Sequence, residues 1–186
     1  MREERKINIA NKITFARIFL IPFCILELKI NTQVSRILSC AIFIIAALTD
    51  ALDGYIARSR NMVTNLGKFL DPLVDKILIC SVLISLAELG DIDSWLAIII
   101  LIREFLVTGL RTIMAEKNKI MSAEILGKIK TISQMIMCII LILNPILNTI
   151  FNNYFLLKYF FVTLSLSLTI ISGFKYINKN KSLFSN

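Results

Sequence analysis

The chain contains no histidine, and it has only 6 Gly, 3 Pro and 1 Trp among its 186 residues. Without histidine, a Ser-His-Asp triad, a Cys-His pair and a histidine-ligated metal site are all excluded. The composition also excludes collagen-like repeats and disordered chains. Acid–base or metal chemistry must therefore use carboxylates, lysine, cysteine or tyrosine. The 4 cysteines stand singly in apolar stretches without a CxxC pair, so we expect them to be reduced and buried.

Apolar residues are what the chain has in excess. They make up 56% of the sequence, and the mean hydropathy is +0.75, although 18% of the residues are charged. An ordinary soluble domain is roughly 45–50% apolar. In a soluble protein the net charge of +8 would suggest nucleic acid as the partner, but the long apolar runs favour a membrane and argue against nucleic acid.

Six apolar segments approach the roughly 20 residues that a transmembrane helix needs. Short polar connections separate them, and no repeat or linker interrupts the chain. We therefore expect an all-α, polytopic membrane protein with six transmembrane helices and a single domain over residues 1–186, with an N-terminal cytoplasmic segment of about residues 1–12. No small-residue cleavage site follows Cys24, so we expect the first helix to be retained. The expected helices cover residues 13–30, 35–57, 68–89, 94–114, 124–147 and 154–175.

The basic residues predict the orientation, because cytoplasmic loops are enriched in Lys and Arg. Of the 21 Lys and Arg residues, only Lys29, Arg36 and Lys158 fall on one side of the expected membrane. Three more lie inside the expected helices, and the remaining 15 of the 21 fall on the other side. This asymmetry predicts that both termini are cytoplasmic, which requires an even number of spans.

Four aspartates lie where an apolar helix should not carry charge. Asp50 and Asp53 are spaced i,i+3 near the cytoplasmic end of the second segment, and Asp71 and Asp75 are spaced i,i+4 in the third. Each spacing puts a pair on one helix face. The short connection makes the two helices antiparallel neighbours, so we expect both pairs at the same depth. Ionisable groups inside a membrane are costly and indicate function by default.

One or two divalent cations would allow these four carboxylates to ionise together. Oxygen-only ligation favours hard ions such as Mg²⁺ or Mn²⁺, and two ions would form a clamp for phosphoryl chemistry. Two other interpretations stay open: salt bridges to Arg58, Lys76 and Arg103, or a path for protons or cations. Small residues near the aspartates would let a ligand approach closely, and Arg58 is placed either for a pyrophosphate or as a topology signal.

The same residues form a longer pattern. The chain resembles the CDP-alcohol phosphotransferase family most closely in its members that use glycerol 3-phosphate as acceptor, and the resemblance runs from about residue 7 to residue 135. Stretches at residues 11–17, 64–72, 102–111 and 127–134 support this choice. All eight fixed positions of the family signature are present: Asp50, Asp53, Gly54, Ala57, Arg58, Gly67, Asp71 and Asp75.

This resemblance implies a reaction. Similar family members transfer a phosphatidyl group from CDP-diacylglycerol to a small alcohol and release CMP. Here the expected acceptor is glycerol 3-phosphate and the expected product is phosphatidylglycerophosphate. The resemblance also implies two Mg²⁺ or Mn²⁺ ions per site, a homodimer, contact with membrane lipid, and a site on the cytoplasmic side of a bacterial cytoplasmic membrane. The alternatives are a member that makes cardiolipin or uses serine, inositol or inositol phosphate, and, from another class, a cation or proton transporter.

The resemblance implies roles for individual residues. The four aspartates would bind the two metal ions, and Asp75 would also be the general base that takes the proton of the attacking hydroxyl. The cytidine diphosphate would be bound by Asp50, Gly54, Ala57, Arg58 and Gly67.

The phosphate of the acceptor predicts a second, basic site. Arginine suits phosphate through its bidentate fork. The candidates are Arg111 and Lys128, followed by Arg103 and Arg17. For Lys128 the alternative is a topology signal, and for Arg103 it is a buried ion pair with a carboxylate such as Glu104. The sixth segment is expected to add only hydrophobicity.

Overall fold

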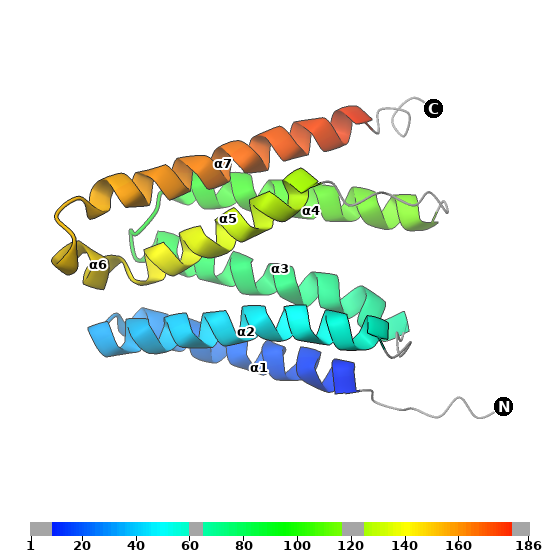
Figure 1. Ribbon diagram of the computed structural model, residues 1–186, viewed down its shortest axis with the longest axis horizontal. Helices are drawn as coiled ribbons and strands as arrows, with labels where there is room; N and C mark the ends of the chain where they lie inside the picture. The colour runs from blue at the N-terminus through cyan, green and yellow to red at the C-terminus, as the bar shows by residue number, and fades with distance from the viewer. Residues whose placement is uncertain (1–8, 60–64, 117–124, 180–186) are drawn as a thin grey trace. The chain divides into compact units, whose positions relative to one another are not determined.

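Seven helices and no strand make up the described part of the computed structural model, which comprises residues 9–59, 65–116 and 125–179 (Figure 1). This confirms the all-α prediction. The helices are α1 (Ile9–Ile30), α2 (Gln33–Ser59), α3 (Asn65–Glu88), α4 (Ser94–Glu116), α5 (Ile125–Ile142), α6 (Asn144–Ile150) and α7 (Tyr154–Lys179).

Five of the six expected segments correspond to one helix each, and their ends agree to within four residues. The prediction of one helix over residues 124–147 was wrong, because the chain breaks at Leu143 between α5 and α6. Pro145 explains the break: it has no N–H to offer the carbonyl of Leu141, and its ring would collide with that carbonyl. The N–H of Leu147 instead bonds to the Leu143 carbonyl at 2.9 Å, which closes the first turn of α6.

The chain divides into two compact units, Met1–Ser85 and Leu86–Asn186. The first unit holds α1, α2 and most of α3, and the second holds the end of α3 and all of α4 to α7. Each unit has buried apolar side chains of its own. The expectation of a single domain over residues 1–186 stays a prediction.

In the first unit, α1 and α2 pack side by side along a seam of small and apolar side chains (Figure 1). Ile21, Cys24 and Leu28 form the buried stripe of α1. Ser39 of α2 is completely buried, and its hydroxyl donates to the carbonyl of Cys24 at 2.9 Å. Small residues at such a crossing let two helix backbones approach closely, as is typical of membrane helices. All four cysteines are buried, and none of them forms a disulfide, as predicted.

A left-handed residue and a capping box make the turn between α1 and α2. Asn31 has a φ of 59°, a conformation that asparagine adopts more readily than most residues. The hydroxyl of Thr32 accepts from the N–H of Ser35 at 3.2 Å, and the hydroxyl of Ser35 accepts from the N–H of Thr32 at 2.8 Å. Arg36 Nε donates to Asn31 Oδ1 at 2.9 Å. These contacts fix the turn that sets α2 beside α1.

Replacing Ser39 by leucine is expected to loosen the α1–α2 seam. The larger side chain has no space between two closely packed helices, and overpacking of this kind costs about 1–3 kcal/mol. We therefore expect a lower midpoint of thermal unfolding for the detergent-solubilised protein. The control is Ala41→Leu, at an exposed position of the same helix, which should leave the midpoint unchanged. Equal midpoints for the two variants would contradict the packing described.

In the second unit, α7 contacts both α4 and α5 (Figure 1). Two hydrogen bonds cross from α5 to α7 within a largely apolar contact. Gln134 Nε2 donates to Thr169 Oγ1 at 3.3 Å, and the hydroxyl of Tyr154 donates to the carbonyl of Ile140 at 2.9 Å. Because Gln134 and Thr169 are completely buried, this contact is partly polar inside the unit.

Two helices of the described residues are long and apolar enough to cross a membrane, Ile125–Ile142 and Tyr154–Asn178. The other long helices carry more charge, as α4 does with Arg103, Glu104 and Arg111. Large apolar side chains are nevertheless exposed on all six long helices, which is typical of surfaces that face lipid. The helices are therefore compatible with an integral membrane protein. On α1, α2, α3, α4, α5 and α7, examples that are more than half exposed are Phe19, Ile45, Ile84, Phe105, Ile132 and Phe160.

Candidate active site

The eight signature residues lie on two successive helices, five near the end of α2 and three near the start of α3. The backbone is helical at Asp50, Asp53, Asp71 and Asp75, so each pair shares one helix face as predicted. Their side chains lie outside the described part of the structure, and the meeting of the four carboxylates stays a prediction. The same holds for the side chains of Ala57 and Arg58 and for the close approach of a ligand at Gly54 and Gly67.

Buried residues stand at helical spacing before Asp50 and after Asp75. Four and seven residues before Asp50 stand Ala46 and Phe43, neither of which has exposed surface. Three residues after Asp75 stands Leu78, which is only 2% exposed. Residues at these spacings share one face of a helix. The register therefore predicts that Asp50 and Asp75 share these faces, where carboxylates need compensation.

The four aspartates are the candidate ligands of a metal site in this chain. Among the side chains that the structure describes, no three or more His, Cys, Asp or Glu residues gather into a group. Four carboxylates supply only oxygen ligands, which fit hard divalent cations and differ from the nitrogen and sulfur ligands of zinc or copper sites. The residue types present therefore fit Mg²⁺ or Mn²⁺.

A buried ion cluster joins α4 to α5 in the second unit. Nη1 of Arg103 lies 3.4 Å from Oε1 of Glu104, and the same carboxylate oxygen pairs with Nζ of Lys130. The side chains of Arg103 and Lys130 are only 14% and 3% exposed. The alternative interpretation of Arg103, an ion pair with Glu104, is thus confirmed. This ion pair does not use every donor of the guanidinium, because Nε of Arg103 has no hydrogen-bond acceptor among the described residues.

α7 completes the surroundings of Arg103, which the sequence did not predict. Nη2 of Arg103 donates to Oγ of Ser172 at 2.9 Å. A Cβ on Gly173 would lie 3.2 Å from Cγ of Arg103, so the arginine stem lies directly against the α7 backbone. The signal in the sequence was the spacing of Ser165, Thr169 and Ser172, which puts three buried hydroxyl residues on one face of an apolar helix. The expectation that this segment adds only hydrophobicity was wrong.

The other basic candidates occupy different settings. Arg111 is exposed on α4, eight residues after Arg103. Lys128 is exposed in the first turn of α5, two residues before the buried Lys130. Arg17 is 1% exposed on α1 and belongs to the first unit. The structure brings none of the three beside Arg103 through a described contact, and the roles of all four basic candidates stay predictions.

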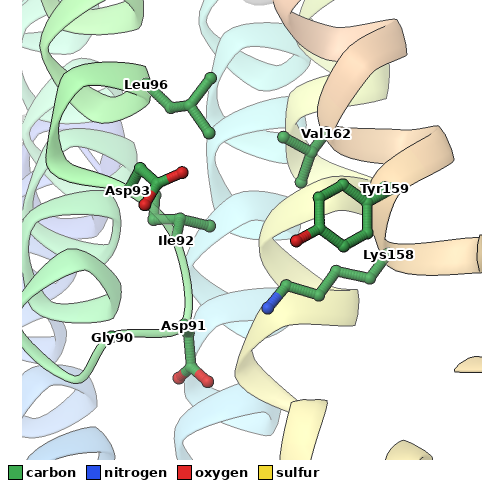
Figure 2. A pocket seen from close by; sticks show the side chains of 8 residues that line it. All are labelled: Gly90, Asp91, Ile92, Asp93, Leu96, Lys158, Tyr159 and Val162. Carbon is green, nitrogen blue, oxygen red and sulfur yellow. The ribbon is translucent and has the colours of Figure 1, made fainter. Parts of the chain in front are cut away.

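A small hollow lies near the start of α4, at the end of that helix opposite to Arg111 (Figure 2). It measures about 100 Å³ and lies between the α3–α4 turn and the first turns of α7. Asp91 on the turn accepts a hydrogen bond from the Asn144 amide, and Lys158 and Tyr159 lie across the hollow from it. The residues that line the hollow include none of the predicted site residues.

Comparison with known proteins agrees with the signature. Residues 7–171 match the family described as CDP-alcohol phosphatidyltransferase. The chain is 39% identical to the CDP-diacylglycerol–glycerol-3-phosphate 3-phosphatidyltransferase of Bacillus subtilis (strain 168), over 93% of this chain and 95% of the relative. It is 40% identical to the protein of the same name from Rickettsia bellii (strain RML369-C), over 95% of this chain and 97% of the relative. The chain therefore belongs to the CDP-alcohol phosphatidyltransferase family.

Proposed function

We propose that this protein transfers the phosphatidyl group of CDP-diacylglycerol to glycerol 3-phosphate, giving phosphatidylglycerophosphate and CMP. The observation that carries the proposal is the 40% identity, over 95% of the chain, to a relative named for this reaction. The predictions of an enzyme and of a phosphatidyl transferase agree with the family. Arg103 of α4, which is mostly buried and whose Nε has no acceptor among the described residues, supports an acceptor that carries a phosphate.

The donor is bound by the signature residues of α2 and α3. Arg58 pairs with the pyrophosphate, and the small residues Gly54, Ala57 and Gly67 leave room for the cytidine diphosphate beside Asp50. Enzymes of this family generally use divalent metal ions, and we assign two Mg²⁺ or Mn²⁺ ions to the four aspartates. When bound, such ions neutralise the pyrophosphate and the charge that develops on the departing CMP.

Asp75 moves the proton in this proposal. Its carboxylate accepts the hydrogen of the attacking hydroxyl of glycerol 3-phosphate, directly or through one water. That oxygen then forms a bond to the phosphorus that carries diacylglycerol, and the bond from this phosphorus to the CMP oxygen breaks.

The acceptor is held by its phosphate. Arg103 offers a planar fork of N–H donors, and Arg111 and Lys128 add charge from the exposed surfaces of α4 and α5. Arg17 is a further candidate.

The six long helices α1 to α5 and α7 each span the membrane in this proposal, and residues 1–186 act as one catalytic domain. The imbalance of basic residues supports a topology with both termini and the active site on the cytoplasmic side of a bacterial cytoplasmic membrane. The exposed apolar side chains on all six helices support contact with lipid. A homodimer is part of the proposal through the resemblance to the family.

The reaction is tested by following CMP release from CDP-diacylglycerol with purified protein, Mg²⁺ and one candidate alcohol at a time. We expect release with glycerol 3-phosphate, and release at background level with serine, inositol, inositol phosphate and phosphatidylglycerol. Removing divalent cations with a chelator should stop the reaction, and Mg²⁺ or Mn²⁺ should restore it.

Each alternative has its own outcome in this assay. Release with a different alcohol alone would replace the acceptor and keep the family chemistry. Undiminished release after chelation would contradict the role of the four aspartates as metal ligands. Ion flux into liposomes without any nucleotide would favour the transporter, although four carboxylates near one end of two helices are a poor path across a whole membrane.

A further inference from the structure

Arg103 is held from two sides before any substrate binds. Glu104 contacts Nη1 at 3.4 Å from one side, and Ser172 contacts Nη2 at 2.9 Å from the other. Glu104 also pairs with Lys130, so the carboxylate is itself fixed between α4 and α5. A guanidinium whose plane is fixed can accept a phosphate without first losing side-chain freedom.

Ser172 has the geometry of a dedicated acceptor for this guanidinium. Its hydroxyl donates to the Thr169 carbonyl at 3.1 Å, which uses its only hydrogen. The oxygen therefore meets Arg103 Nη2 as an acceptor. Since Ser172 is only 4% exposed, water is a poor substitute for it.

Gly173 provides the space for the arginine stem. A side chain at this position would begin 3.2 Å from Cγ and 3.8 Å from Nε of Arg103. At Gly109 and Gly127, in contrast, an added Cβ would meet nothing within 4 Å. Glycine inside a helix is less favourable than alanine by about 1 kcal/mol, so Gly173 is explained by the close approach of Arg103.

We propose that Ser172 and Gly173 of α7 are positioning residues, which fix the Arg103 guanidinium in the orientation that receives the phosphate of the acceptor. The inference rests on the proposed function, because it presupposes that glycerol 3-phosphate is the acceptor. In this proposal α7 takes part in substrate selection, through a contact between two residues that are 69 positions apart in the sequence.

The test measures KM for each substrate separately, with the full-length protein. Ser172→Ala and Ser172→Val remove the hydroxyl, and Ser172→Thr keeps it in nearly the shape of valine. We expect the Ala and Val variants to raise KM for glycerol 3-phosphate about five- to tenfold, which corresponds to the loss of one ordinary hydrogen bond. KM for CDP-diacylglycerol should stay unchanged, and the Thr variant should stay close to wild type.

Gly173→Ala should raise KM for glycerol 3-phosphate by a similar factor, because the added methyl group displaces the arginine stem. Two controls match these variants: Ser167→Ala, at an exposed serine of the same helix, and Gly109→Ala, where the methyl group meets open space. Both should keep the wild-type constants.

The possible outcomes distinguish a failure of this inference from a failure of the proposed function. If the wild type releases no CMP with glycerol 3-phosphate, the proposed function fails and the inference fails with it. If the wild type is active but the Ala and Val variants keep its KM for glycerol 3-phosphate, positioning by α7 alone is refuted. Equal increases of KM for both substrates would also refute it, because they indicate a general structural defect.

Discussion

Asp75→Asn is expected to lower kcat by about 10³-fold or more while the protein still folds and inserts. Asparagine keeps the shape of the side chain but cannot take the proton of the attacking hydroxyl, and general-base catalysis contributes roughly 10²- to 10⁴-fold. The loss of one carboxylate also weakens the metal site, which adds to the effect. CMP release at saturating concentrations of both substrates is the measurement.

The matched control for this variant is Asp93→Asn, which removes a carboxylate from an exposed position just before α4. It should keep full activity. Thermal unfolding of the Asp75→Asn variant without divalent cations should give a midpoint at least as high as that of the wild type, because one of the four like charges assigned to the metal site has been removed. Wild-type turnover by Asp75→Asn would contradict the assigned base.

Arg103→Ala is expected to raise KM for glycerol 3-phosphate by about 100-fold, with a much smaller effect on KM for CDP-diacylglycerol. Truncating a buried, hydrogen-bonded charge at a binding site costs about 2–5 kcal/mol, which corresponds to a factor of roughly 30 or more. Glu104 keeps its pair with Lys130 in this variant, so we expect the protein to fold. Steady-state kinetics with each substrate varied in turn measures the effect.

Arg103→Lys separates charge from shape. Lysine keeps the positive charge but has no planar fork for the Glu104 and Ser172 contacts, so we expect it to recover only a small part of the lost affinity. Lys158→Ala, at the hollow near the start of α4, is the control and should bind both substrates normally. An unchanged KM for glycerol 3-phosphate in Arg103→Ala would remove this arginine from the acceptor site.

The local parts of the fold could be predicted from sequence. The long apolar runs indicated six helices, and their ends agree with five of the observed helices because polar turn residues stop an apolar helix locally. The break at Leu143 has an equally local cause, Pro145, but it was not predicted. The apolar run continues past the proline, so its hydropathy indicated one uninterrupted helix. Hydropathy alone does not register a lost backbone hydrogen bond.

The candidate site could be predicted only where its chemistry lies within one stretch of sequence. The four aspartates fall within residues 50–75, so helical spacing was enough to pair them. The partners of Arg103 are different, because Ser172 follows it by 69 residues and Lys130 by 27. No local pattern indicates which face of α7 meets α4. From sequence alone, Lys130 is interpreted as a topology signal, because its partner Glu104 can be identified only in the structure.

The Glu104–Lys130 pair has a consequence for how the protein is made. A lysine that enters the apolar phase of a membrane alone costs up to about 3 kcal/mol, and α5 carries Lys130 in its second turn. α4 precedes it along the chain and brings the carboxylate that offsets this cost. In the proposed six-span topology, α5 therefore enters the bilayer most readily when α4 is already there. The two helices would leave the insertion machinery as a pair rather than one by one.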